Sequence, residues 1–303
     1  MTLLESEARS TLEGILDKLG IKSGDRIMLG IDMSKLPLPS YEAALSIESF
    51  REREQKWCQF VFDILLNHVG SSGTIIVPTF TYSCGKPDSV FNAEFTPSEN
   101  GPFTEFFRTQ PDAVRSLHPI FSLTGIGQDA EKILGRVGRS AFGSMSPYSR
   151  FAANNVKFLC LGVELKNSIT YIHHLEQSYG CPHRYNKSFD TTVICNGKKI
   201  KLEWYAFVGY RGLNYTSDIA SLQDGLKNAG CLVKEEWEEC PNHLVEISDV
   251  DRIGYELLTN NSCAFTSRRL KFSFDEVVDN GLEKGNNSST LLISVAELNP
   301  LAQ

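Results

Sequence analysis

Apolar positions recur along this chain in two patterns. Between residues 5 and 19, Ala8, Leu12, Ile15 and Leu19 return every three to four positions, which is the spacing of an amphipathic helix. Short, nearly continuous apolar runs elsewhere predict strands that are buried in a sheet. Helices are predicted at residues 5–19, 47–69, 104–109, 129–134, 217–228 and 249–259, with one more around Thr170. Strands are predicted at residues 26–31, 74–77, 156–163 and within 115–126.

The C-terminal third has a different pattern. Asn196 and Gly197 separate two strand-like runs, 191–195 and 199–204, and Asn-Gly in this setting predicts a β-hairpin. Further strands are expected at residues 231–236, 243–247 and 290–295, the last after a polar loop at 283–289. We therefore predict an α/β fold, a single domain over residues 1–303, with a central mixed β-sheet flanked by helices and with C-terminal hairpins.

Three internal segments are predicted to be loops: residues 36–46, 81–103 and 137–150. The segment 81–103 is long for a compact protein, and loops of this length are usually functional or disordered. Its aromatic residues favour an ordered wall; they are Tyr82, Phe91, Phe95 and Phe103.

The composition of the chain limits the kinds of partner that we expect it to bind. The formal net charge is -7, whereas a surface that follows nucleic-acid phosphates needs clustered Lys and Arg, so no nucleic acid is expected. No apolar run approaches the roughly 20 residues of a membrane span, and the N-terminus lacks the basic start and apolar core of a signal peptide. No membrane partner is expected. A homodimer is compatible with a chain of this size.

The eight cysteines are scattered and form no CxxC pair. This pattern indicates reduced thiols and a cytoplasmic location. Cys181 and His183 flank Pro182 and could supply two metal ligands, but no second pair has the spacing of a zinc site. No metal is expected.

Thr170, His173 and Glu176 are the candidate catalytic residues. They are three positions apart each time, so on a helix they would share one side beside the end of a predicted strand. An imidazole with a carboxylate to fix its tautomer and a hydroxyl nearby has the parts of a general base site. Only His173 is three positions from both partners, and His174 is expected to pack. The same three residue types also occur together on helices by chance.

Four further segments stand out, each weak when taken alone. They read GTIIVPTFTY at 73–82, TPSENGPFTEFFR at 96–108, RSLHPIFS at 115–122 and GSMSPYSR at 143–150. Together with the Thr-His-Glu set, their order closely resembles the aminoglycoside 3-N-acetyltransferase family over roughly residues 10 to 185. The cofactor and catalytic motifs lie within 26–185, and residues 186–303 match less clearly.

This resemblance implies transfer of acetyl from acetyl-CoA to an amine of an amino sugar. The acceptor would be an aminoglycoside antibiotic, with resistance as the role, or a biosynthetic amino-sugar intermediate, which two departures from the family pattern favour slightly. The residues suggest the mechanism: His173 takes the amine proton while the amine attacks the thioester directly. Backbone N–H groups near Thr79 to Thr81, or the Thr170 hydroxyl, would stabilise the oxyanion.

The resemblance also implies binding residues. Those expected along acetyl-CoA are Ser34, Lys35, Thr79, Phe80, Ser116, His118, Ser122, Ser146, Tyr148 and Arg150. Those expected at the small-molecule amine acceptor are Asp32, Tyr82 and Glu105. Asp32 departs from the His-Ser-Ser-like sequence of many family members, and it would either attract an ammonium group or cap the following turn. The segment 36–53, which resembles an insertion, is a second departure.

Two other functions fit the same residues. A hydrolase could use Ser, His and Glu, although the chain lacks a GxSxG elbow. A catalytically silent CoA-binding protein could share the fold, although the intact Thr-His-Glu set argues against it.

Overall fold

A computed structural model describes residues 4–40, 47–210, 213–268, 270, 276–279 and 291–294. The helices are α1 (Glu5–Leu19), α2 (Ile47–Val69), α3 (Pro102–Arg108), α4 (Ala130–Leu134), α5 (Ile172–Tyr179), α6 (Ala220–Asn228) and α7 (Ile247–Asn260). The strands are β1 (Arg26–Ile31), β2 (Thr74–Pro78), β3 (Val90–Asn92), β4 (Val114–Arg115), β5 (Leu123–Gly127), β6 (Val156–Leu161), β7 (Arg184–Phe189), β8 (Thr192–Cys195), β9 (Lys198–Lys201), β10 (Trp204–Gly209), β11 (Val233–Trp237), β12 (Cys240–Glu246), β13 (Glu276–Asp279) and β14 (Leu291–Ser294).

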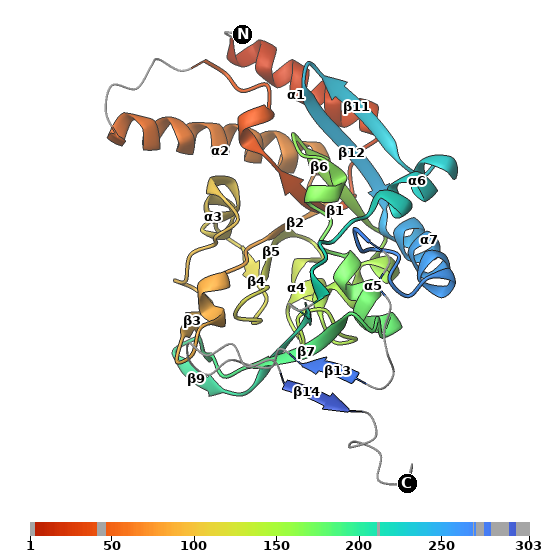
Figure 1. The fold of residues 1–303 in the computed structure, drawn as a ribbon. Helices are drawn as coiled ribbons and strands as arrows, with labels where there is room; N and C mark the ends of the chain where they lie inside the picture. The colour runs from red at the N-terminus through yellow and green to blue at the C-terminus, as the bar shows by residue number, and fades with distance from the viewer. Residues whose placement is uncertain are drawn as a thin grey trace.

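A seven-stranded mixed sheet forms the centre, in the order β11-β12-β6-β1-β2-β5-β4 (Figure 1). β1 runs parallel to both β6 and β2, whereas β12 and β5 pair antiparallel outside them. Helices α1, α2 and α3 bury their apolar side chains on one face, and α4 to α7 bury theirs on the other. The predicted α/β fold with a central mixed sheet and flanking helices is confirmed.

The three parallel strands end at the same edge of the sheet. Asp32 follows β1, Thr79 follows β2 and Gly162 follows β6. Because β2 and β6 lie on opposite sides of β1, this edge is a switch point of the topology, where open α/β sheets bind ligands.

The hairpin predicted around Asn196 and Gly197 is confirmed. β8 and β9 pair antiparallel, and both turn residues have the positive φ that a tight two-residue turn requires. The strand expected at 290–295 is present as β14, but its partner β13 was not predicted. The strands expected at 231–236 and 243–247 are β11 and β12, and they extend the central sheet. The loop expected at 283–289 lies outside the described residues.

Some elements differ from prediction in their bounds or in being present at all. α3 begins at Pro102 rather than 104, since proline is well suited to the first helical position. The segment 115–126 contributes two short strands separated by a loop. β7 and β10, which pair with each other, were not predicted.

All eight cysteines are free thiols, as expected. None of the helices in the described part of the chain is long and apolar enough to cross a membrane.

Gly30, near the end of β1, packs directly beneath Ser168. A Cβ atom at Gly30 would lie 1.6 Å from Ser168 Oγ. We expect Gly30→Ala to lower the free energy of unfolding by about 1–3 kcal/mol, as overpacking does. Urea unfolding would measure it. Gly14→Ala in α1 is the matched control, because a Cβ there meets nothing within 4 Å and should stabilise by up to about 1 kcal/mol. Equal stability of the two variants would contradict this packing.

Candidate active site

A buried carboxylate, Glu176, organises the site. Its Oε2 lies 2.8 Å from His173 Nδ1 and 2.7 Å from Arg184 Nε, and its Oε1 lies 2.9 Å from His183 Nε2. Glu176 and His183 are fully buried. His173 and Glu176 face each other one turn apart on α5, and the chain returns past Gly180, whose φ is 81°, to bring in the other two residues.

Burial alone would raise the pKa of Glu176. Hydrogen bonds from His173 and His183 and the positive charge of Arg184 outweigh it and lower the pKa to about 2. Glu176 is therefore a carboxylate at neutral pH. It can accept a hydrogen bond from one ring N–H of each histidine.

His173 is held with one nitrogen inward and the ring partly exposed. With Nδ1 as donor to Glu176, Nε2 is the unprotonated nitrogen and an acceptor. The side chain keeps 23% of its surface exposed. Burial and then the charge of Arg184 lower the pKa of His173, although Glu176 opposes them. The imidazole is therefore neutral at pH 7, which a base needs.

An aromatic wall joins His173 to the end of β2; it consists of Phe80, Tyr82, Phe121 and Phe142. The Phe142 ring lies 5.4 Å from the His173 ring and 5.1 Å from that of Phe121. Phe121 in turn lies 5.3 Å from Phe80 and 6.0 Å from Tyr82. Tyr82 is 53% exposed, whereas Phe80 and Phe142 are buried, so these ring contacts lead from an exposed residue through the core to the histidine.

Thr170 is not on the helix, contrary to prediction. α5 begins at Ile172, and Thr170 lies in the turn before it, where its carbonyl accepts the His173 N–H at 3.1 Å. Its hydroxyl has only a long contact of 3.5 Å to the Ser168 carbonyl. The Thr170 hydroxyl therefore lies near the start of α5, and its O–H makes only this one long contact among the described residues.

The backbone donors expected for an oxyanion are occupied. The N–H of Thr79 bonds to the Ser122 carbonyl, and that of Thr81 bonds to the Ile120 carbonyl, each at 2.9 Å. The N–H of Phe80 bonds to Asn100 Oδ1 at 2.6 Å. The expectation that these groups stabilise an oxyanion is therefore wrong, because each is used in holding the strand end together.

Several residues expected along acetyl-CoA form a buried frame instead. Thr79, Ser116, His118 and Ser122 are at most 2% exposed. The Ser122 hydroxyl donates to the Thr79 carbonyl at 2.7 Å, and Ser116 Oγ accepts the Leu123 N–H at 2.9 Å. Burial lowers the pKa of His118 to about 4, so its imidazole is neutral at pH 7. Its Nε2 lies 3.0 Å from the Tyr205 carbonyl and links this frame to the strand that contains Tyr205.

Arg115 is the first residue of the RSLHPIFS motif, and no role was predicted for it. Its guanidinium lies under the strand end, donating to the Thr79 carbonyl at 2.9 Å and Ser122 Oγ at 3.1 Å, and it stacks 4.6 Å from the Phe91 ring. Burial lowers its pKa to about 10, so it is still a cation. Arg115 thereby fixes the position of Phe80 in the aromatic wall.

Four other predicted residues are not among those that bond to Glu176, although the Tyr148 ring lies 5.4 Å from that of Phe142 in the aromatic wall. Arg150 donates to the Ile133 carbonyl at 2.7 Å and so closes the end of α4. Glu105 pairs with Arg108 and accepts the Ser98 N–H at 2.7 Å. Ser146 and Tyr148 are buried, and their hydroxyls have no hydrogen-bond partner within the described residues.

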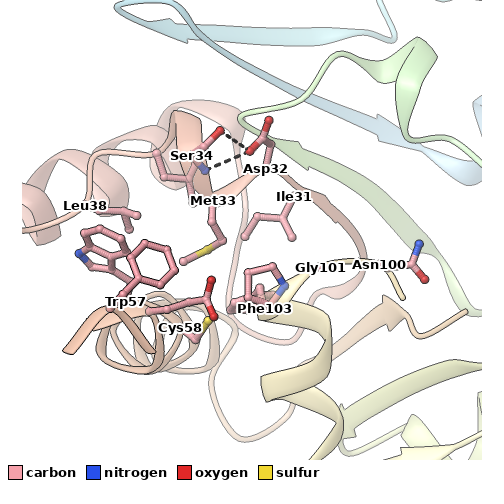
Figure 2. Close-up of a pocket in the computed structure, with 14 residues that line it drawn as sticks. Ile31, Asp32, Met33, Ser34, Leu38, Trp57, Cys58, Asn100, Gly101 and Phe103 are labelled. Atoms are coloured by element: carbon pink, nitrogen blue, oxygen red, sulfur yellow. Dashed lines mark hydrogen bonds between the residues drawn. The ribbon is translucent and has the colours of Figure 1, made fainter. Parts of the chain in front are cut away.

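A cavity of about 710 Å³ opens beside the end of β1 (Figure 2). Asp32 and Ser34 line it, and Asp32 Oδ1 accepts both the Ser34 N–H at 3.0 Å and its hydroxyl at 2.7 Å. Asp32 therefore caps the turn Met33–Lys35, one of the two roles considered for it. Lys35 is exposed and lines a second cavity of about 440 Å³ with Glu238 and Glu239.

Metal ligands are not gathered in this region. Within the described ranges no three His, Cys, Asp or Glu side chains are placed to share a metal ion. Burial raises the pKa of Cys181 to about 12, so it is a thiol rather than a thiolate ligand.

Comparisons with known proteins identify the family of this chain. A family model described as aminoglycoside 3-N-acetyltransferase matches residues 45–259. Aminoglycoside N(3)-acetyltransferase VIII of Streptomyces fradiae is 25% identical over 279 residues, which covers 82% of this chain and 90% of the relative. Aminoglycoside N(3)-acetyltransferase IX of Micromonospora chalcea is 23% identical over 211 residues, covering 63% and 69%.

Solved structures share the fold at low identity. The structure of AAC-VIa bound to sisomicin has a TM-score of 0.68 and 19% identity, and the match covers 86% of this chain and 98% of that one. The structure of AAC-IIIb with CoASH has a TM-score of 0.66 and 20% identity, covering 83% and 96%.

Proposed function

Because the chain belongs to the aminoglycoside 3-N-acetyltransferase family, we propose that it transfers the acetyl group of acetyl-CoA to a primary amine of an amino sugar, with His173 as general base. A structural neighbour holds CoASH, and others hold sisomicin, a gentamicin and apramycin, which supports this co-substrate and this kind of acceptor. The acceptor is an aminoglycoside or an amino-sugar intermediate.

The observation that carries the proposal is His173 anchored on Glu176 at 2.8 Å with Nε2 left as an acceptor. Nε2 takes a proton from the amine as the amine nitrogen bonds to the thioester carbon. Glu176 stabilises the imidazolium that results. The C–S bond then breaks, and His173 returns the proton to the leaving sulfur, giving the amide and free CoA. The Thr170 hydroxyl is the oxyanion donor in this scheme.

The reaction is tested by measuring CoA release with acetyl-CoA and a panel of amines, with the product mass determined. The panel contains several aminoglycosides, free amino sugars and nucleotide-linked amino sugars. One acetyl group gained by one amine class is the expected result. CoA release that needs no amine would indicate a hydrolase, and acetyl-CoA binding without any release would indicate a silent binding protein.

The pH profile of kcat/KM follows from the lowered pKa of His173. The base works when neutral, so lowering its pKa extends activity to lower pH. We expect the acidic limb attributable to His173 to have its midpoint below about 6.5, the ordinary value for histidine. The profile is measured with two acceptors whose amines differ in pKa, because a limb from the amine moves with the acceptor whereas that of His173 stays. A fixed limb above 7 would contradict the assignment.

A further inference from the structure

The carboxylate of Glu176 is shared by two histidines. The His173 ring bonds to its Oε2 at 2.8 Å, and the His183 ring bonds to its Oε1 at 2.9 Å. Arg184 places its charge 2.7 Å from Oε2, but its two terminal nitrogens donate to a carbonyl of β10 and to Ser217 Oγ, each at 3.2 Å. Within the described residues, the two imidazoles therefore provide the side-chain hydrogen bonds to this carboxylate, one for each oxygen.

The surroundings of His183 favour a single ring proton, on Nε2. The side chain is fully buried, and Nδ1 has no hydrogen-bond partner among the described residues. The His183 carbonyl accepts the Tyr215 hydroxyl at 3.1 Å and the Tyr210 N–H at 3.3 Å, so its backbone is held as well. The Tyr215 ring stands perpendicular to the imidazole, with 5.1 Å between the ring centres. His183 therefore serves Glu176 as a neutral donor, because a second proton would have no described acceptor.

The other titratable groups around this carboxylate are uncharged at neutral pH. Burial raises the pKa of Cys181 and of Tyr215 to about 12 each, and it also raises the pKa of Cys263. These side chains come from the segments that follow α5, β10 and α7, so three parts of the chain enclose the carboxylate with neutral groups. Among the described residues of this cluster, Glu176 and Arg184 carry the formal charges, one negative and one positive.

We propose that His183 is a positioning residue that sets the base strength of His173 through the carboxylate they share. The inference rests on the proposed function, in which His173 accepts the amine proton. An N–H donated to Oε1 draws negative charge away from Oε2, so the carboxylate holds a proton on His173 less strongly. Arg184 acts in the same direction through its charge. A base with a weaker hold on its proton also returns that proton more readily to the leaving sulfur.

Two substitutions separate the hydrogen bond from the space that His183 fills. His183→Gln keeps an N–H in the place of Nε2, whereas His183→Met fills a similar volume without a donor. Loss of one such hydrogen bond should raise the midpoint of the acidic limb of kcat/KM by about 0.5–1 pH unit in the methionine variant. Below the limb, kcat/KM of that variant should fall by about 3- to 10-fold. The glutamine variant should keep a midpoint close to that of wild type.

Tyr215→Phe is the matched control. It removes the hydroxyl that bonds to the His183 carbonyl at 3.1 Å, and so disturbs the same surroundings without removing a donor to Glu176. Its acidic limb should keep the wild-type midpoint, because a purely structural effect lowers the rate at every pH and does not move the limb. An unmoved limb in His183→Met, or an equal movement in Tyr215→Phe, would overturn the proposal.

Nitrogen-15 NMR of the histidines tests the same inference without substrate. In wild type, His183 should keep one ring proton, on Nε2, while His173 titrates, and its ring shifts should follow that titration. A separate midpoint for His183 in the same pH range, or no response to His173, would overturn the proposal.

The NMR titration also separates this inference from the reaction. If the His173 midpoint rises in His183→Met while wild type acetylates no amine, the coupling stands and the acetyltransferase assignment fails. If wild type acetylates an amine while the His173 midpoint is the same in His183→Met, the reaction stands and the coupling fails.

Discussion

Replacing His173 by alanine is expected to lower kcat for acetyl transfer by about 10²- to 10⁴-fold, the usual contribution of a general base. The imidazole is the group that removes the amine proton, and its Nδ1 is committed to Glu176 at 2.8 Å, so no neighbouring residue inherits its position. KM should change little, because the loss concerns proton transfer rather than acceptor binding. The measurement is steady-state CoA release with the mass of the acetylated amine confirmed.

His174→Asn serves as the matched control for this variant. His174 is buried, and its Nδ1 lies 2.6 Å from the Phe142 carbonyl, a contact that an asparagine amide can reproduce. This variant should keep most of its activity. If His173→Ala retained the wild-type rate, or if both variants lost it equally without unfolding, His173 would not be the base.

Replacing Glu176 by glutamine should affect both stability and rate. A glutamine has one accepting oxygen for two histidine nitrogens and no charge to balance Arg184. Removing one partner of such a buried group destabilises by about 3–5 kcal/mol. Loss of the carboxylate also weakens His173 as a base, so kcat should fall as well. Urea unfolding and steady-state kinetics measure the two effects separately.

The pH dependence of stability gives an independent test of Glu176. Its pKa is about 2 in the folded protein against an ordinary 4.5. The carboxylate therefore contributes stability above pH about 4.5, and the contribution is lost as the pH falls toward 2. The glutamine variant should lack this part of the acid unfolding curve. His183→Gln, which keeps a side-chain donor for Glu176, should retain more stability than Glu176→Gln, and the reverse order would contradict the central role of the carboxylate.

The sequence predicted the central pair but not its surroundings. The three-residue spacing placed His173 and Glu176 on one side of a helix, and they are in contact there. Thr170 lies outside the helix, and its position was mispredicted because no capping side chain marks the start of α5, where the preceding Tyr171 is already helical in its backbone. Periodicity identifies a helix face but does not define where the helix begins.

His183 and Arg184 were missed for a different reason. The chain reverses at Gly180, so these residues reach Glu176 through a tertiary contact that no repeat spacing encodes. The available signal was the Cys-Pro-His sequence, which was considered only as a source of metal ligands.

The hydroxyls of the motifs were also misassigned, because a hydroxyl in a motif can face a ligand or a neighbouring strand. At Ser116 and Ser122 it faces the strand, and this follows from β4, β5 and the strand end being packed together.

The sheet order has a consequence for synthesis on the ribosome. β1 lies between β2 and β6, and Arg26 pairs with Val156, so one edge of the central strand has no partner until just over half of the chain has been made. At typical elongation rates of about 5–20 residues per second, that interval is roughly 6–26 seconds. An apolar strand with an open edge during that time is prone to intermolecular pairing. Yield of the folded protein should therefore depend on translation speed and on chaperones that hold nascent chains.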